Sequence, residues 1–264
     1  MPESSLSHTH SSLRKAIAHF LGYGRDSAKW TSTQEEDIDE SLETGQRYFY
    51  TPPTLPGEEN SHYWTFLRPV TTLTTVAAQS TYTLPDNYGN LLGTITFPEN
   101  EYYAPIEIIP DDQLRNLKRN DLSTFPQYAS IRPILNDGTN GQRFELELFP
   151  TPSEAWVLSY RYEILKDKMS SSNPYPDGGQ AFAECLREAC LAAAELNIDD
   201  EYGLHHARFM DLLRSCISRD RRNNTTEFYG QNLDYGNFYG PTNEDNFYKG
   251  QLYAKPVTYK GVMY

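Results

Sequence analysis

Hydrophobic residues recur at helical spacing near the start of the chain. One apolar stripe runs from Leu13 to Leu21 and predicts a helix there, with Ser11 or Ser12 as its N-cap. A second helix is expected to begin at Ser32, because Ser32 and Glu35 have the spacing of a capping box. The residues predicted to form its buried face are Ile38, Leu42, Gly45 and Phe49. The N-terminal region, residues 1–52, is therefore predicted to be helical.

The helical period returns after a Pro- and Gly-rich stretch at 174–179. Phe182, Leu186 and Ala189 begin an apolar face, and the run Ala192–Ala194 permits close approach of a partner helix. Another helix is expected from about Asp200, and its end carries a cationic stretch that suits a helix C-terminus: Arg219, Arg221 and Arg222. Residues 171–222 thus predict a helical hairpin.

Between these helical regions, residues 53–170 change to a period of two and are rich in Thr, Tyr and Val. Prolines at 52, 53 and 56 end the preceding helix. Strands are expected near 63–68, 72–76, 80–84, 91–97, 106–109, 128–132, 143–149 and 156–164, with one short helix over 110–118. The predicted class is α+β: a helical bundle made by both ends of the body, with an inserted antiparallel β domain.

The final stretch, 223–264, has few large aliphatic residues but repeats aromatic pairs. We expect its rings to bind a partner; they are Phe228, Tyr229, Tyr235, Phe238, Tyr239, Phe247, Tyr248, Tyr253, Tyr259 and Tyr264. Ordering this stretch costs roughly 40–80 kcal/mol of backbone entropy, whereas burying ten rings returns only about 40 kcal/mol. The stretch is therefore predicted to be an extended arm that is ordered on other molecules; disorder and stacking on single-stranded nucleic acid are the alternatives.

Composition narrows the class of partner. The net charge of −13 and the lack of a long basic run disfavour free DNA binding. The 20 tyrosines are typical of a chain with much contact surface. Cys185, Cys190 and Cys216 lie in helical patterns and are expected to be reduced, buried thiols in a cytoplasmic setting. No apolar run suggests a signal peptide or a membrane span.

Common catalytic motifs such as GxSxG, the P-loop, GxGxxG, CxxC and HExxH are missing from the sequence. The best candidate for chemistry is an acid–histidine cluster of Asp199, Asp200, Glu201, His205 and His206. Adjacent histidines on a helix point about 100° apart, so we interpret the cluster as an interhelical turn rather than a metal site. No enzyme activity, metal or cofactor is predicted.

Several segments carry a resemblance to a known family. They are Leu13–Ile17, Tyr82–Gly89 leading into Gly93–Phe97, Leu148–Pro152, Leu158–Tyr162 and the hairpin Ala181–Arg222. In this order the chain resembles head-to-tail adaptor (connector) proteins of tailed bacteriophages. The resemblance implies a virion protein at the head–tail interface, assembled in the host cytoplasm as a ring, typically of twelve subunits, below the portal. The implied partners are the portal protein, neighbouring copies, a downstream tail or nozzle protein, and DNA that passes through without sequence-specific binding.

Two other classes remain open at this point. A carbohydrate- or protein-binding module would use rings of the β region, namely Tyr63, Trp64, Tyr102, Tyr103 and Trp156. An enzyme would depend on the acid–histidine cluster alone. Sugar platforms need several exposed, coplanar rings, whereas Trp64 and Phe66 would share one face of a strand and pack inward.

Overall fold

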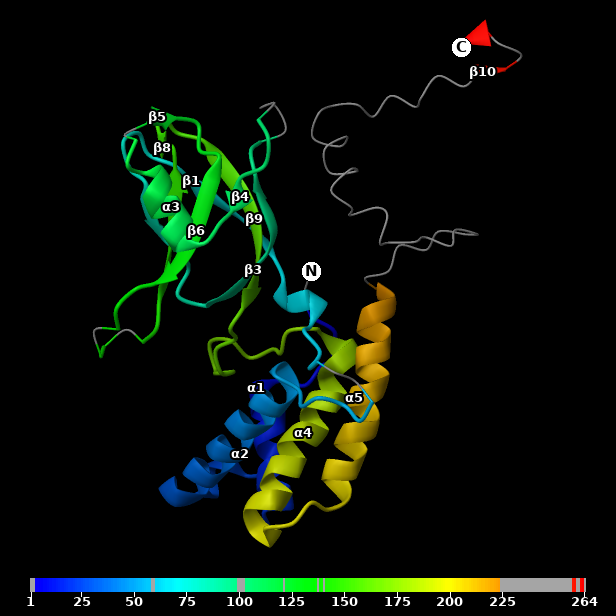
Figure 1. Cartoon of the computed structure of the whole chain (residues 1–264). Helices are drawn as coiled ribbons and strands as arrows, with labels where there is room; N and C mark the ends of the chain where they lie inside the picture. The colour runs from blue at the N-terminus through cyan, green and yellow to red at the C-terminus, as the bar shows by residue number, and fades with distance from the viewer. Residues whose placement is uncertain are drawn as a thin grey trace. The chain divides into compact units, whose positions relative to one another are not determined.

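A computed structural model describes residues 3–57, 60–98, 103–120, 122–136, 138–139 and 141–223, together with two short strands at 258–259 and 262–263. Helices and strands occur in separate parts of the chain, which confirms the α+β class (Figure 1). The chain divides into two compact units. A helical unit contains the chain up to Pro69 and from Glu163 through the last helix, and a β unit contains Val70–Tyr162.

Four long helices build the helical unit: α1 (His10–Phe20), α2 (Ser32–Tyr50), α4 (Gln180–Asp199) and α5 (Leu204–Asn223). The prediction of two helices on each side of the β region is confirmed. The predicted caps were wrong by one to three residues, because the capping boxes are formed by Thr9 with Ser12 and by Thr31 with Gln34. A threonine one residue earlier supplies the same hydroxyl and leaves Ser32 inside the first turn of α2.

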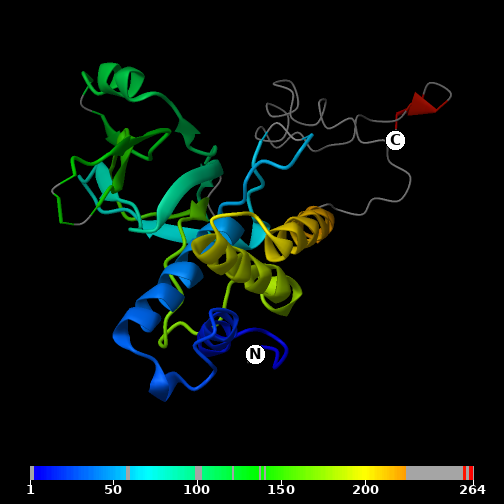
Figure 2. The same ribbon diagram turned by 90° about the horizontal axis from the view of Figure 1, so that it is seen from below.

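Helix α4 is the centre of this unit. It packs extensively against α2 and α5, while α1 packs against α2 and α4 (Figures 1 and 2). Cys190 of α4 lies against α2, where a Cβ at Gly45 would come within 2.4 Å of the Cys190 Cα. Glu188 of α4 instead contacts His205 of α5. Two residues are about 200° apart on a helix, so α4 presents nearly opposite sides to α2 and α5.

The segment expected as a strand at 63–68 is not one. It contains a 3-10 turn, Thr65–Leu67, and belongs to the core of the helical unit. Trp64 stacks against both Phe49 and Phe66, with ring centroids 5.1 and 5.3 Å away, and its indole N–H donates to the Phe49 carbonyl at 2.7 Å. Large aromatic residues at every second position suggested a strand. In the structure the segment is irregular, and Trp64 and Phe66 both pack against α2 and α4.

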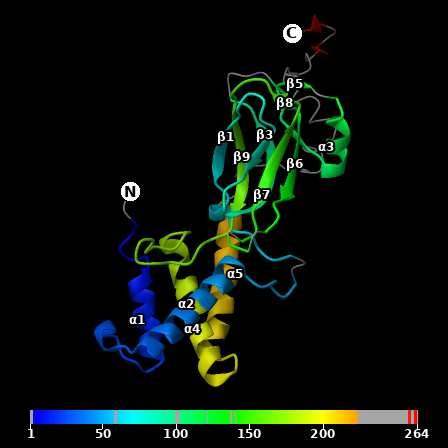
Figure 3. The same cartoon turned by 90° about the vertical axis from the view of Figure 1, so that its left-hand side faces the viewer.

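The β unit has a three-stranded sheet in the order β1-β9-β3 and a four-stranded sheet in the order β2-β7-β6-β4 (Figure 3). The bounds are β1 Val70–Thr74, β2 Thr81–Thr83, β3 Tyr88–Thr96, β4 Glu107–Ile108, β6 Tyr128–Pro133, β7 Phe144–Phe149 and β9 Val157–Ile164. Helix α3 (Asp111–Leu117) packs against β6, and β5 (Ser123–Thr124) pairs with β8 (Thr151–Pro152). The β4–β6 and β5–β8 pairs are parallel, so the expected all-antiparallel domain is a mixed one.

The chain enters and leaves the β unit on neighbouring strands. Val70 of β1 is paired with Arg161 of β9 in antiparallel register. Among the described residues between these two positions, none belongs to the main apolar cluster of the helical unit. The β unit has its own buried residues, among them Ile95, Ile106, Leu146, Leu148 and Leu158. Each unit therefore has its own core.

Candidate functional site

The predicted partner-binding rings fall almost entirely outside the described residues. Phe228, Tyr229, Tyr235, Phe238, Tyr239, Phe247, Tyr248, Tyr253 and Tyr264 are not described. The backbone of Tyr259 lies in β10 (Thr258–Tyr259), which pairs with β11 (Val262–Met263). The arm's role therefore stays a prediction, and the candidate surfaces come from the two units.

Helix α2 carries acidic side chains on the side that faces away from α4. Its buried residues include Ile38, Leu42 and Phe49, and Glu36 and Glu40 are exposed on the opposite side of the helix. Other acids of α2 are held by neighbours: Asp39 pairs with Arg14 of α1 at 2.8 Å, and Glu43 accepts from Lys168 at 2.6 Å. Among the residues that the structure describes, no cation pairs with Glu36 or Glu40. Two carboxylates one turn apart thus remain available to a partner.

Helix α5 carries the opposite charge on its outward side. Its exposed residues include four arginines, at 214, 219, 221 and 222, against a single exposed acid, Asp211. A fifth exposed arginine, Arg208, turns toward α4 and lies 3.6 Å from Glu188. Arg214, Arg221 and Arg222 line a groove of about 440 Å³ whose apolar wall includes Leu55 and Ile217. In a chain of net charge −13, this is a distinct cationic face, which we call the α5 arginine face.

The acid–histidine cluster forms the turn between α4 and α5 without bringing its members onto one centre. The ring Nδ1 of His205 lies 2.8 Å from Glu188, and the backbone N–H groups of His205 and His206 donate to the Glu195 carboxylate at 3.0 and 3.3 Å. Glu195 therefore caps the first turn of α5. Within the described ranges, no group of three or more His, Cys, Asp or Glu side chains is arranged to hold a metal ion.

Sequence reasoning missed the buried carboxylates. Glu188, Glu195 and Asp220 are all buried, and Asp220 binds three groups of the connecting segment. These are the His62 ring at 2.8 Å, the Thr65 amide at 3.0 Å and the Thr65 hydroxyl at 2.6 Å. The sequence carries one signal of this burial: Asp220 falls on the apolar face of α5 together with Phe209, Leu213 and Cys216.

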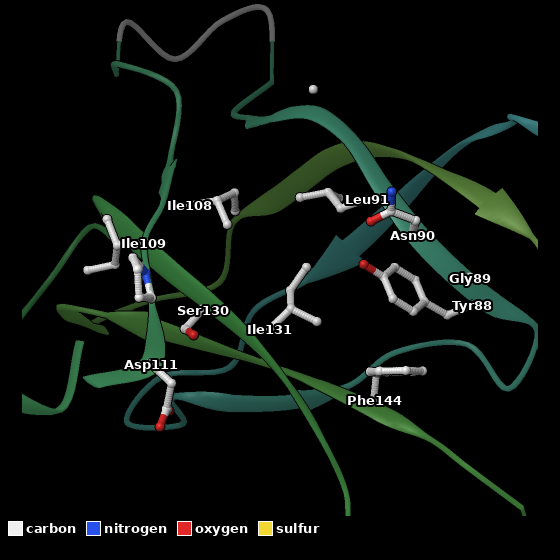
Figure 4. A pocket seen from close by; sticks show the side chains of 12 residues that line it. Tyr88, Gly89, Asn90, Leu91, Ile108, Ile109, Asp111, Ser130, Ile131 and Phe144 are labelled. Atoms are coloured by element: carbon white, nitrogen blue, oxygen red, sulfur yellow. The ribbon is translucent and has the colours of Figure 1, made fainter. Parts of the chain in front are cut away.

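The β unit offers an open groove between β3 and the β4–β6 edge (Figure 4). Its volume is about 630 Å³, and Tyr88, Leu91, Ile108 and Ile131 give it a mainly apolar lining. Its one carboxylate, Asp111, is already paired with Arg115 at 2.9 Å and lies 3.5 Å from Arg132. An open groove with a mainly apolar lining is a candidate contact surface.

The rings of the proposed sugar platform are not assembled. Trp64 and Trp156 are buried, with 1% and 6% exposure, and they belong to different units. Tyr63 and Tyr103 are exposed, and Tyr102 is outside the described residues. The burial of Trp64 and Trp156 means that neither indole can serve as a sugar-stacking surface.

The three cysteines are free and buried, as expected. Burial raises the pKa of the Cys190 thiol to about 12. A hydrogen bond to Cys216, together with burial, raises the pKa of Cys185. Both groups are therefore protonated at neutral pH, which makes them small apolar side chains rather than nucleophiles.

Helices of the described chain are too short or too polar to serve as membrane spans. Comparison with curated proteins gives no match. A family model described as "SU10 adaptor protein" matches residues 9–232. The match begins at the N-cap of α1 and runs through both units and past the end of α5. The chain therefore belongs to the SU10 adaptor protein family of phage head-to-tail adaptors.

Proposed function

We propose that this chain is a structural virion protein that forms a ring between the portal and the tail and lets DNA pass through. The observation that carries the proposal is the family match over 9–232, which includes all four long helices and the strands from β1 to β9. The proposed partners are the portal protein, neighbouring copies in a ring of twelve, and a downstream tail or nozzle protein. No chemistry is assigned to the chain.

Two features of the body support this role. Its helical unit has a closed core, yet α2 and α5 both keep strongly charged outward sides. The β unit adds an apolar groove that suits contact with another protein. Charged and apolar surfaces of this kind on one small body are typical of a subunit that makes several protein contacts.

The proposal assigns the aromatic arm to the portal or to adjoining subunits. The arm starts directly after α5, and its ten rings would give each copy many shallow anchors. The described residues of the body form an apolar core, so the body can be tested without the arm.

The test is deletion of 223–264, compared with the full chain in a binding assay against the portal protein of the same virus. We expect the truncated body to keep its circular dichroism spectrum and to lose docking. A second variant retains the arm's length and replaces its ten aromatic residues by Ser; it is expected to lose docking as well. Undiminished docking of both variants would contradict the role of the arm, and failure of the full chain to form rings with the portal would contradict the function.

A further inference from the structure

We propose that the α5 arginine face of one copy contacts the acidic outward side of α2 on the next copy, so that these two helices form the repeating contact of the ring. The inference rests on the proposed function, because it names the surfaces that would join neighbouring subunits. The positions and the charges of α2 and α5 within the helical unit support this contact.

The positions of α2 and α5 in the helical unit allow contact between successive copies. Helix α4 lies between α2 and α5 and touches them with nearly opposite sides, through Cys190 and Glu188 respectively. The outward sides of α2 and α5 therefore point away from each other (Figure 1). A subunit with two different contact faces on opposite flanks can join to its neighbours head to tail, which is the geometry that generates closed rings.

Charge decides which faces meet. An α5 face against another α5 face would bring eight arginines together, and α2 against α2 would oppose the carboxylates of Glu36 and Glu40. Only α5 against α2 brings opposite charges into contact. Like-charge contacts across an interface cost several kcal/mol and suppress wrong pairings, so the charge pattern favours the heterologous contact over a twofold dimer.

The groups needed for this contact are available. Within the described part of the chain, Arg219 and Arg222 have no acidic partner, and Glu36 and Glu40 have no cationic one. Arg214 makes only a 3.9 Å contact with Asp211, and both of these side chains are exposed. Arg214, Arg219 and Arg222 can therefore contact Glu36 and Glu40 without breaking a strong internal ion pair.

The experiment traps the contact by cross-linking. Thr33 on α2 and Ser218 on α5 are both exposed, and both are replaced by Cys in one full-length chain. The native cysteines are buried, so a short bis-maleimide should react at positions 33 and 218. Mixing ¹⁴N and ¹⁵N chains identifies links between copies by mass spectrometry. We expect such links to join 33 to 218 rather than 33 to 33 or 218 to 218.

Charge reversal tests the chemistry in this background. One variant carries Arg219→Glu and Arg222→Glu, and its matched counterpart carries Glu36→Lys and Glu40→Lys. Each variant alone loses the net attraction between the two faces, so cross-linking should fall at least about tenfold, which corresponds to about 1.4 kcal/mol. A 1:1 mixture restores opposite charges at every contact of an alternating ring and should recover cross-linking, with all links joining unlike variants.

Three results would overturn the inference: no 33–218 link at any concentration, links mainly between identical positions, or cross-linking unaffected by charge reversal. If reversal leaves the links unchanged but abolishes binding to a DNA duplex, the α5 arginine face contacts DNA and not another copy. Rings that still form on the portal with either variant would refute this contact alone. Absence of any ring with the unmodified chain would refute the proposed function.

Discussion

Asp220 shows how a single residue joins distant parts of the helical unit. Its carboxylate is 2% exposed and accepts hydrogen bonds from the Thr65 amide and hydroxyl and contacts the His62 ring, about a hundred and fifty positions away in the chain. Sequence patterning finds the apolar stripe of α5, but it cannot distinguish a buried acid from an exposed one, because the partners that stabilise the acid come from elsewhere. Glu188 and Glu195 escaped prediction for the same reason.

Replacing Asp220 by Ala is expected to lower the free energy of unfolding by about 2–4 kcal/mol, since it leaves buried donors without an acceptor. Asp220→Asn keeps one acceptor oxygen and should cost less. The control is Asp211→Ala on the same helix; the Asp211 side chain is 81% exposed, and its loss should change stability by no more than about 0.5 kcal/mol. Urea denaturation measures all three, and equal effects of Asp220→Ala and Asp211→Ala would contradict the assignment.

At the scale of elements, apolar residues at helical spacing predicted both N-terminal helices. Five of these side chains are buried: Leu13, Ile17, Ile38, Leu42 and Phe49. The prediction of a strand at 63–68 was wrong, because large aromatic residues at every second position also occur in irregular segments. Helix α4 was predicted to bury one face, whereas it is buried on nearly all sides. Its central position depends on contacts with two other helices, which its own sequence does not specify.

Gly45 allows α2 and α4 to touch through their backbones. A Cβ at this position would lie 2.4 Å from the Cα and 2.6 Å from the N of Cys190, so the helices would have to move apart. Gly45→Ala should therefore destabilise the protein by about 1–3 kcal/mol, although alanine by itself favours a helix by about 1 kcal/mol.

Chemical denaturation monitored by circular dichroism checks the sign of this effect, with Thr44→Ala as the control on the adjacent position. Adding Cys190→Ala should not rescue Gly45→Ala, because the clash is with backbone atoms. An unchanged or increased stability of Gly45→Ala would show that the two helices are further apart than the structure places them.

At the scale of the whole molecule, sequence patterning predicted the order of helical, strand-rich and helical regions, and with it the α+β class. It did not predict that the segment before Val70 packs into the helical core, since Trp64 and Leu67 look like strand residues until the helices that cover them are known. The mixed strand order was also hidden, because the β4–β6 pairing joins residues on either side of α3.

Because each unit has its own core, the helical unit should fold without the β unit. Val70 and Arg161 are paired across β1 and β9, so their Cα atoms are only about 5 Å apart. A Gly-Ser linker of a few residues that joins Pro69 to Glu163 in place of Val70–Tyr162 can therefore span the gap. We expect the shortened chain to be helical by circular dichroism and to unfold cooperatively in urea.

The companion measurement is the β unit, Val70–Tyr162, expressed alone, which should unfold in its own cooperative transition. If the shortened chain instead lacks a cooperative transition, the helical core depends on the inserted strands. A cooperative helical unit would imply that α2 and α5, which carry the opposite charges, are held in place by contacts within the helical unit, and that contacts between neighbouring copies can be studied on this smaller frame.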